Sequence, residues 1–386
     1  MAGWKGINRR DFLKLGITGT ASAMLGTGPV SEALAAQGPF VFPKPVYRTL
    51  GRTGLKVTVV SFGAMLTPEP EVIRYAFDHG VNYVDTARVY MGGRNEEIVG
   101  RALKGIRHKV YVATKTRSSS ESGKAIINDV ETSLRKLGTD YIDFIQLHSL
   151  RGKERVYIQE TREGLLKLKQ QGKVRFFGVT THTNQAAVLN ALVDDPDRFF
   201  DTALVAYNFE SGADVKNAIA RAAKAGVGII GMKNLAGGYE TAELGPFTPH
   251  QAAIKWVLQD SNVATVIPGM RNMAELREDV AVMGMKLSFL DEVVLKRYAA
   301  AIDSYYCRMC AECEPTCPRG VGISTINRAL MYKEAYRSGE LARSTYREVP
   351  ASCSAEACLE CGACSARCRH GLDIPAKMAM ARKVLA

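Results

Sequence analysis

The chain has 386 residues, of which 46% are hydrophobic and 23% charged, ordinary values for a globular protein with room for two domains. No window of about 18 consecutive strongly apolar residues is present, so the sequence predicts no transmembrane helix. The formal net charge of +12 comes from scattered Lys and Arg without a basic patch interleaved with aromatic residues, which argues against a nucleic-acid partner.

The first 36 residues have the layout of a cleaved export signal. Two adjacent arginines, Arg9 and Arg10, precede an uncharged, moderately apolar stretch over residues 15–31, and a small-residue ALAA sequence follows. That order resembles a twin-arginine signal, although Asn8 stands where Ser or Thr is more usual. We therefore expect contact with the export machinery and a periplasmic or membrane-associated location, with cofactors inserted before export. The alternative is a short amphipathic helix at a ragged N-terminus.

From about residue 57 to residue 285, short apolar runs alternate with helical patterns. The runs show little alternation between apolar and polar residues, which is typical of strands buried on both faces of a parallel sheet. The predicted strands are Val57–Ala64, Tyr83–Thr86, Val110–Lys115, Tyr141–His148, Val174–Thr180, Ala203–Asn208, Gly228–Lys233 and Ala264–Gly269.

Amphipathic segments separate these runs. The clearest one places four apolar residues on one helical face, namely Ile126, Val130, Leu134 and Leu137. Glycines mark the expected helix ends, at Gly80, Gly138, Gly172 and Gly226.

Eight strand–helix units over roughly 230 residues match the size of a TIM barrel. We therefore predict a (β/α)8 TIM barrel over residues 37–285, with a hairpin at Tyr47–Lys56 beneath it. The alternative is a doubly wound open sheet, but no G-x-G-x-x-G motif follows a first strand.

Four acid/base side chains stand on or beside consecutive predicted strand ends. Asp85 ends the second strand, and Tyr90 lies in the loop after it. Lys115 ends the third strand, and His148 ends the fourth. Any one of them alone is more simply explained as structural, for instance as a helix-capping Asp. Because the active sites of these barrels lie at the carboxyl ends of the strands, the four together indicate a catalytic site.

The segments GVNYVDTARVY, VYVATKT and DYIDFIQLHS resemble the motifs of the aldo-keto reductase superfamily, over roughly residues 46–285. The resemblance implies an Asp–Tyr–Lys–His tetrad that interconverts a small aldehyde, ketone or sugar and its alcohol. In that scheme Tyr90 is the general acid or base, and the ammonium of Lys115 lowers the pKa of Tyr90. Asp85 would hold Lys115 in place, and His148 would orient the carbonyl or tune the Tyr.

The same resemblance implies a nicotinamide nucleotide, NADP(H), but the contacts depart from the family's pattern. Thr180 and Thr181 stand where a Ser-Asn pair usually holds the nicotinamide amide, and the sixth and seventh strands lack the usual Gln and stacking aromatic residue. Lys233 would meet a pyrophosphate as a point charge, and Arg271 a 2′-phosphate. The candidate nucleotide contacts are Thr180, Thr181, Asn208, Lys233, Gly269 and Arg271.

All nine cysteines lie in the C-terminal region, a distribution too one-sided for a disulfide framework. Eight of them form two C-x2-C-x2-C-x3-C motifs, the spacing of bacterial [4Fe–4S] sites in which the fourth cysteine ligates the other cluster. We expect two [4Fe–4S] clusters, one held by Cys307, Cys310, Cys313 and Cys368, the other by Cys317, Cys358, Cys361 and Cys364. Zinc is the alternative, but zinc sites use two ligand pairs and need no triple sets.

Residues 307–386 are predicted to form a small α-helical ferredoxin-like domain, joined to the barrel by a linker helix over residues 286–306. The stretch between the two cysteine motifs, Gly322–Tyr346, reads as helix with one apolar side. Cys353 is left over, and we interpret it as a buried free thiol.

The two halves of the chain move electrons differently, because a hydride carries two electrons and a [4Fe–4S] cluster carries one. In one hypothesis, the barrel interconverts a carbonyl and an alcohol while the clusters exchange electrons with a redox partner protein. In a second, the clusters only brace the C-terminal domain and the barrel uses NADP(H). In a third, the barrel is a scaffold for an electron-transfer or binding module. Export favours the first hypothesis, because free nicotinamide nucleotide is expected to be scarce outside the cytoplasm.

Overall fold

The computed structural model describes residues 40–117, 120–241, 244, 248–361 and 363–385. The predicted export signal at residues 1–36 lies outside these ranges. Phe42–Ala386 forms one compact unit. Within the described ranges, no helix is long and apolar enough to cross a membrane.

A short antiparallel hairpin precedes the barrel, in the place predicted for it. Its two strands are β1 (Tyr47–Thr49) and β2 (Lys56–Thr58). Arg48 extends from β1 and donates hydrogen bonds to the backbone carbonyls of Leu258 and Val263, at 2.6 Å each. The hairpin is thereby fastened to the last strand–helix unit of the barrel.

The first barrel strand is shorter than predicted. The apolar run Val57–Ala64 is not one strand, because its first residues belong to the hairpin and only β3 (Phe62–Gly63) joins the barrel sheet. Between them, the hydroxyl of Ser61 donates to the carbonyl of Thr58 at 2.9 Å. Such local bonds from side chain to backbone compete with strand pairing and turn the chain.

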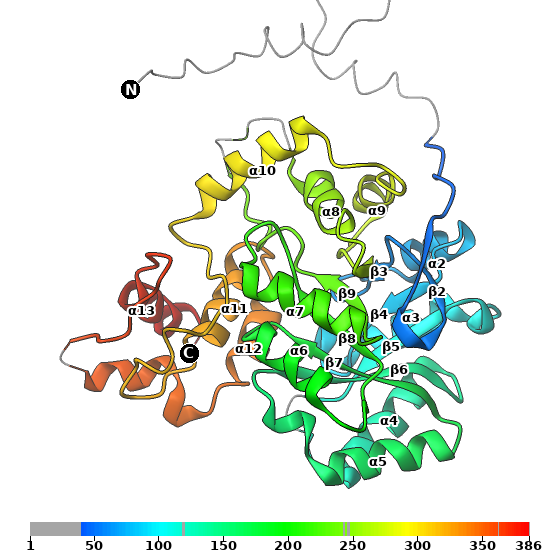
Figure 1. The fold of residues 1–386 in the computed structure, drawn as a ribbon, viewed down its shortest axis with the longest axis horizontal. Helices are drawn as coiled ribbons and strands as arrows, with labels where there is room; N and C mark the ends of the chain where they lie inside the picture. Colours follow the sequence, from blue (N-terminus) through cyan, green and yellow to red (C-terminus); the bar gives the residue numbers. More distant parts are fainter. Residues whose placement is uncertain (1–39, 118–119, 242–243, 245–247, 362, 386) are drawn as a thin grey trace, which may run out of the picture. The chain divides into compact units, whose positions relative to one another are not determined.

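Eight parallel strands, β3 to β10 in chain order, form the sheet (Figure 1). The bridges Val60↔Val266 and Gly63↔Gly269 join its first and last segments, so the sheet curls back on itself. After β3 the strands are β4 (Tyr83–Asp85), β5 (Tyr111–Lys115), β6 (Ile142–Leu150), β7 (Val174–Thr181), β8 (Thr202–Ala206), β9 (Gly228–Met232) and β10 (Val263–Val266). The arrangement is that of a (β/α)8 TIM barrel and confirms the predicted fold.

Helices connect the strands, and α4 buries the apolar face predicted for it. Helix α4 (Gly123–Leu137) begins at Ser122, whose hydroxyl accepts from the backbone of Ala125, and ends at Gly138 with φ 64°. The remaining barrel helices are α2 (Pro70–Asp78), α3 (Asn95–Leu103), α5 (Gln159–Gln170), α6 (Gln185–Asp194), α7 (Ala213–Lys224), α8 (His250–Leu258) and α9 (Met273–Val280). Short 3-10 helices are η1 (Gly51–Thr53), η2 (Tyr90–Gly93), η3 (Arg107–Lys109), η4 (Glu154–Val156), η6 (Ala351–Cys353) and η7 (Ala355–Glu360).

The C-terminal region is helical, as predicted. The linker helix α10 (Phe289–Ile302) begins with a capping box formed by Ser288 and Asp291. The stretch Gly322–Tyr346, predicted as one helix, is two helices, and α13 (Ile374–Leu385) ends the described chain.

The two helices between the cysteine motifs are α11 (Ile323–Glu334) and α12 (Gly339–Tyr346). They are separated by Arg337, which has a left-handed φ of 53°. The hydroxyl of Ser338 then caps the start of α12 by accepting from the backbone of Leu341 at 3.3 Å. A left-handed residue followed by an N-cap ends one helix and starts another, which explains the break.

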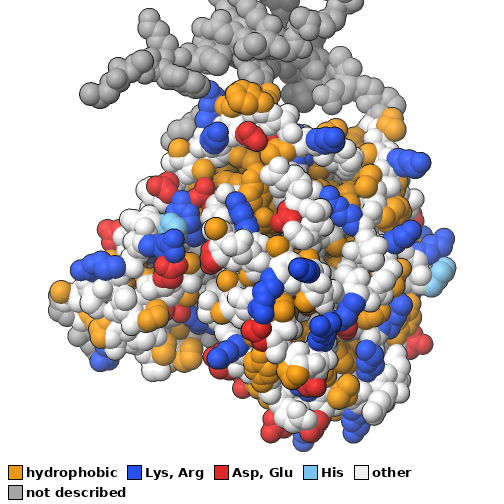
Figure 2. All heavy atoms as spheres, viewed as in Figure 1, with side chains coloured by type: hydrophobic (Ala, Val, Ile, Leu, Met, Phe, Trp, Pro, Cys, Tyr) orange, Lys and Arg blue, Asp and Glu red, His pale blue; other side chains and the backbone are white. Residues whose placement is uncertain are grey.

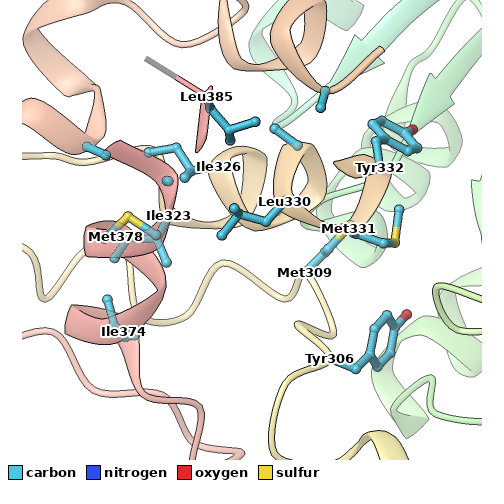
Figure 3. Close-up of a cluster of buried hydrophobic side chains, with 14 of the residues drawn as sticks. Tyr306, Met309, Ile323, Ile326, Leu330, Met331, Tyr332, Ile374, Met378 and Leu385 are labelled. Carbon is cyan, nitrogen blue, oxygen red and sulfur yellow. The ribbon is translucent and has the colours of Figure 1, made fainter. Parts of the chain in front are cut away.

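Helix α11 is buried all round and is the centre of the C-terminal core. Figure 3 shows Ile323 and Ile326 on the side of α13, and Tyr332 on the side of the barrel strands. The hydrophobic cluster around α11 includes Ala236 from the loop after β9 and Tyr298 from α10. One apolar core therefore holds the cysteine-rich region against the barrel.

The viewed face of the molecule carries Lys and Arg among acidic, apolar and uncharged side chains (Figure 2). Among the surface cations of the described residues, Arg221 is paired with Asp194 and Arg74 with Asp78. The net positive charge is thus spread over this face and does not gather in one stripe.

Candidate active site and cluster ligands

The four predicted catalytic side chains meet at one end of the barrel. Asp85 ends β4, Lys115 ends β5, and His148 lies near the end of β6, while Tyr90 opens η2 directly after β4. All four are buried. The Lys115 Nζ lies 4.8 Å from the centre of the Tyr90 ring, and the Tyr90 and His148 ring centres are 6.1 Å apart.

Lys115 and Asp85 form a buried ion pair with additional hydrogen bonds. The Lys115 ammonium donates to Oδ1 of Asp85 and to the carbonyl of Thr86, the latter at 2.7 Å. Gln146, which the sequence analysis did not single out, donates from Nε2 to the other carboxylate oxygen of Asp85 at 2.9 Å. Burial lowers the pKa of Lys115 and raises that of Asp85, and the charge of each partner opposes the shift in the other. The pair is held in one fixed geometry beneath Tyr90.

The electrostatics of Tyr90 differ from the expectation. Burial raises the pKa of Tyr90 well above its usual value, and the charge of Asp85 raises it further. The cation that opposes this rise in pKa is the guanidinium of Arg328, on α11. Lys115 was predicted to lower the pKa of Tyr90, but its charge is compensated by Asp85. The cysteine-rich region therefore supplies the charge that favours the phenolate.

Two histidines at the site are uncharged at neutral pH. Burial lowers the pKa of His148 and of His182 well below 6.5, and Arg328, Lys115 and Lys233 lower both further. The Nδ1 atoms of both rings are buried without a hydrogen-bond partner in the described structure. Neutral imidazoles with a free ring nitrogen can donate to or accept from a bound ligand.

Side chains of the C-terminal region reach the strand ends. Arg328, 4% exposed, donates from Nη1 to the hydroxyl of Ser149 at 3.3 Å and is ion-paired through Nη2 with Glu348. The rings of Tyr332 and Tyr336 lie against the Lys233 ammonium, at 4.4 and 4.7 Å from their centres. The sequence analysis missed these residues, because the only signal for them was a helical pattern in which polar positions look solvent-exposed.

A cavity of about 200 Å³ opens beside the tetrad. Asp85 and Tyr90 line it, together with His182, Lys233 and Tyr336. The lining also includes Gly269, Arg271, Glu275, Glu278 and Asp279, from the segment after β10 and from α9. Because water occupies about 30 Å³ per molecule, the cavity has room for a small organic molecule. Larger surface hollows, such as the one of about 950 Å³ between α3 and α4, contain none of the tetrad.

Three of the candidate nucleotide contacts have hydrogen-bond partners within the chain. The hydroxyl of Thr180 accepts from the backbone of Ser149 at 2.8 Å, and that of Thr181 donates to the carbonyl of Thr183 at 2.9 Å. Asn208 donates to the carbonyl of Lys233 at 3.0 Å and to the hydroxyl of Tyr306 at 3.2 Å. All three side chains are thus part of local hydrogen-bond networks.

The other three candidates line the cavity. Gly269 leaves open space where a side chain would stand, whereas Arg271 is ion-paired with Glu275 at 2.7 Å. Lys233 lies nearest the tetrad, between the two tyrosines. A 2′-phosphate at Arg271 would compete with Glu275, which already pairs with this guanidinium.

The cysteines fall into the two predicted groups. All nine are free thiols. Burial raises the pKa of Cys307 to about 12, and the neighbouring thiols of its own group add to the rise, namely Cys310, Cys313 and Cys368. Burial likewise raises the pKa of Cys358, with further contributions from Cys317, Cys361 and Cys364. The fourth cysteine of each motif thus neighbours the other motif, and Cys353 is half-buried.

Eight thiols in two sets of four match the chemistry of iron–sulfur ligation. In the described part of the chain, no three His, Cys, Asp or Glu side chains converge as the ligands of one metal ion do. A [4Fe–4S] cluster distributes its four thiolates over four irons, so its ligands lie farther apart than those of a single ion. The grouping suits clusters better than a mononuclear site.

Comparison with known proteins assigns both regions. Residues 69–245 match the Aldo/keto reductase family, and residues 306–373 match the 4Fe-4S dicluster domain. L-galactose dehydrogenase of Arabidopsis thaliana is 29% identical, over 64% of this chain and 92% of its own length. Methylglyoxal reductase YeaE of Escherichia coli is 29% identical, over 60% of this chain and 85% of its own. The oxidoreductase YqkF of Bacillus subtilis is 39% identical, but the match covers only 48% of its length.

Solved structures show the same barrel. An aldo-keto reductase from Pseudomonas aeruginosa superposes with a TM-score of 0.53 at 27% identity, over 64% of this chain and 96% of its own. An aldo-keto reductase from Klebsiella pneumoniae, solved in complex with NADPH, gives a TM-score of 0.56 at 24% identity, over 65% and 95%. The barrel and its relatives define an oxidoreductase. The chain carries an aldo/keto reductase family domain followed by a 4Fe-4S dicluster domain, and is an oxidoreductase of the aldo-keto reductase type.

Proposed function

We propose that the protein interconverts a small carbonyl compound and its alcohol at Tyr90, with the electrons exchanged through two [4Fe–4S] clusters. The observation that carries the proposal is the shared cavity, which is lined by Tyr90 of the barrel and by Tyr336 of the cysteine-rich region. Its relatives include a sugar dehydrogenase and a methylglyoxal reductase, which supports a small carbonyl or sugar as the substrate.

Tyr90 moves the proton at the substrate oxygen. Reduction adds two electrons and two protons to the carbonyl group. The Tyr90 hydroxyl gives the proton at oxygen, and water that enters the cavity gives the proton at carbon; oxidation reverses both transfers. Neutral His148, with its free Nδ1, orients the carbonyl oxygen without competing for the proton. The buried Lys115–Asp85 ion pair fixes the side chains next to Tyr90, and Arg328 stabilises the phenolate that remains after proton transfer.

The eight cysteines of the two motifs would hold the clusters. Each cluster would transfer one electron at a time, so two clusters match the two electrons of one carbonyl–alcohol interconversion. Helix α11, which follows the first cysteine motif, packs between the cysteine-rich region and the cavity. A redox partner protein would exchange electrons with the clusters. Consistent with this route, we also propose twin-arginine export to the periplasm or a membrane surface, where nicotinamide nucleotide is scarce.

NADP(H) remains the second candidate electron carrier, supported by the NADPH complex of the Klebsiella pneumoniae structure. An anaerobic assay distinguishes the clusters from NADP(H) as the electron carrier. It measures turnover of a panel of carbonyl compounds with reduced methyl viologen as the electron donor and without nucleotide. Carbonyl-dependent viologen oxidation is the expected result. Turnover that requires NADPH and ignores viologen would overturn the proposed electron route.

A further inference from the structure

The cations around the cavity are paired with carboxylates, with one exception. Lys115 is paired with Asp85, Arg328 with Glu348, and Arg271 with Glu275. Lys233 is different, because no carboxylate in the described part of the chain pairs with its ammonium.

The surroundings of Lys233 are aromatic. Its ammonium lies 4.4 Å from the ring centre of Tyr332 and 4.7 Å from that of Tyr336, and 3.5 Å from the hydroxyl of Tyr336. Aromatic faces stabilise a cation in part, but they provide no countercharge. Both tyrosines come from the cysteine-rich region, so the barrel alone does not complete this environment.

Lys233 faces the reacting end of the cavity. It lines the cavity together with Tyr90 and His182. Burial lowers the pKa of Lys233 well below its usual value, the charges of Arg328 and Lys115 lower it further, and the charge of Asp85, the smallest of these effects, opposes the shift. A buried cation among other cations is costly unless an anion joins it. The site is therefore complementary to an anionic group on the bound molecule.

That anion has two possible sources, the pyrophosphate of a nucleotide or a carboxylate of the substrate itself. The cavity lining also includes Glu275 and Glu278, whose carboxylates disfavour a polyanion. The volume of about 200 Å³ suits a molecule smaller than a dinucleotide. The position beside Tyr90 places the anion next to the reacting carbonyl, so the substrate's own carboxylate is the better match.

We propose that Lys233 binds the carboxylate of a small oxo or hydroxy acid, so that the carbonyl or alcohol carbon next to that carboxylate lies at Tyr90. This inference rests on the proposed function and names its substrate class. Lys233 is then a substrate-binding residue that depends on Tyr332 and Tyr336 for its position.

Calorimetric binding to the cluster-loaded protein tests the proposal with two matched probes. Pyruvate carries a ketone beside a carboxylate, whereas hydroxyacetone carries the same ketone beside a neutral alcohol. Pyruvate is expected to bind at least tenfold more tightly than hydroxyacetone. The Lys233→Met variant should lose at least tenfold in pyruvate affinity and little in hydroxyacetone affinity, and Lys233→Arg should keep the preference for pyruvate.

A control variant and a third probe decide between the two sources of the anion. Lys333→Met removes an exposed cation from α11, the helix that carries Tyr332, and should leave pyruvate binding unchanged. Equal pyruvate affinity in wild type and Lys233→Met overturns the proposal. The third probe is ADP-ribose, which carries the pyrophosphate of a nucleotide. If Lys233→Met loses affinity for ADP-ribose but not for pyruvate, Lys233 binds a nucleotide and the proposal is also overturned. Because binding needs no turnover, Tyr90→Phe should keep the pyruvate preference even if the proposed reaction fails.

Discussion

Arg328 on α11 donates to the hydroxyl of Ser149 at 3.3 Å, and Ser149 directly follows His148 on β6. Through this contact, a side chain from between the two cysteine motifs becomes part of the barrel's strand-end site. Arg328 is held from the other side by Glu348, which follows α12. The two domains therefore share a buried network of charges, so a substitution in one domain should change the stability or the activity of the other.

Removing the partner of Arg328 should destabilise the whole chain. In Glu348→Gln, the guanidinium stays buried without its carboxylate, which typically costs about 3 kcal/mol or more. Anaerobic denaturant unfolding followed by circular dichroism measures the loss. The control is Glu240→Gln, which breaks the exposed pair of Arg337 and Glu240 and should cost less than about 1 kcal/mol. Equal effects of the two substitutions would contradict a structural role for the buried pair.

Substitution of Tyr90 should stop the chemistry and leave the fold intact. Tyr90→Phe removes the hydroxyl that moves the proton, and loss of a general acid or base lowers kcat by about 10²–10⁴-fold. The visible spectrum of the clusters and the melting temperature should stay close to those of the wild type. Tyr75→Phe, on α2 and outside the cavity, is the matched control. Unchanged turnover in Tyr90→Phe would rule out the assigned role.

The buried histidines should make the protein sensitive to acid. The pKa values of His148 and His182 are depressed by burial, so the unfolded chain takes up protons below about pH 6.5 that the folded chain does not. Stability is then fully present above pH 6.5 and falls as the pH drops, by up to about 1.4 kcal/mol per pH unit for each histidine.

Unfolding free energies measured between pH 5 and 8 in two variants isolate this effect. His182→Gln should have a shallower acid slope than the wild type, because one of the two buried histidines is gone. His108→Gln changes an exposed histidine and should keep the wild-type slope. If His182→Gln and His108→Gln lose stability equally on acidification, the buried imidazole is not the cause.

The cysteine grouping predicts the effect of single substitutions on iron content. The wild type should bind about eight irons per chain, four in each cluster. Cys368→Ser removes a ligand of the cluster that Cys307, Cys310 and Cys313 hold, and should lower the iron content by up to about four. Cys353→Ser should leave it unchanged, since Cys353 belongs to neither group. Iron analysis together with low-temperature electron paramagnetic resonance distinguishes these outcomes, and iron loss in Cys353→Ser would show that the ligand set is wrong.

The tetrad was predictable because strand periodicity alone brings Asp85, Lys115 and His148 to one end of a parallel barrel. The eight-stranded fold followed from the same pattern, apart from the short first strand, where the bond between Ser61 and Thr58 interrupts the apolar run. These features depend on residues that are close in sequence or on repeats of one simple unit.

The contribution of α11 was not predictable in this way. Its sequence shows apolar residues at helical spacing, and such a pattern places Arg328 on a solvated face. In the structure both faces of α11 are covered, by α13 on one side and by the barrel on the other (Figure 3). The position of Arg328 against Ser149, 179 residues apart in sequence, depends on how the two domains pack. The same packing explains why Arg328, and not Lys115, is the cation that most lowers the pKa of Tyr90.

The most direct test of the proposed function is a single-turnover measurement of the cluster absorption band. The protein is reduced anaerobically with one equivalent of dithionite per cluster, freed of excess reductant, and mixed with a panel of small aldehydes, ketones and oxo acids without nucleotide. The band should return in the wild type with at least one of these compounds and should not return in Tyr90→Phe. Equal return in both proteins, or return in the wild type only after NADP⁺ is added, would contradict the proposed electron route through the tetrad and the clusters.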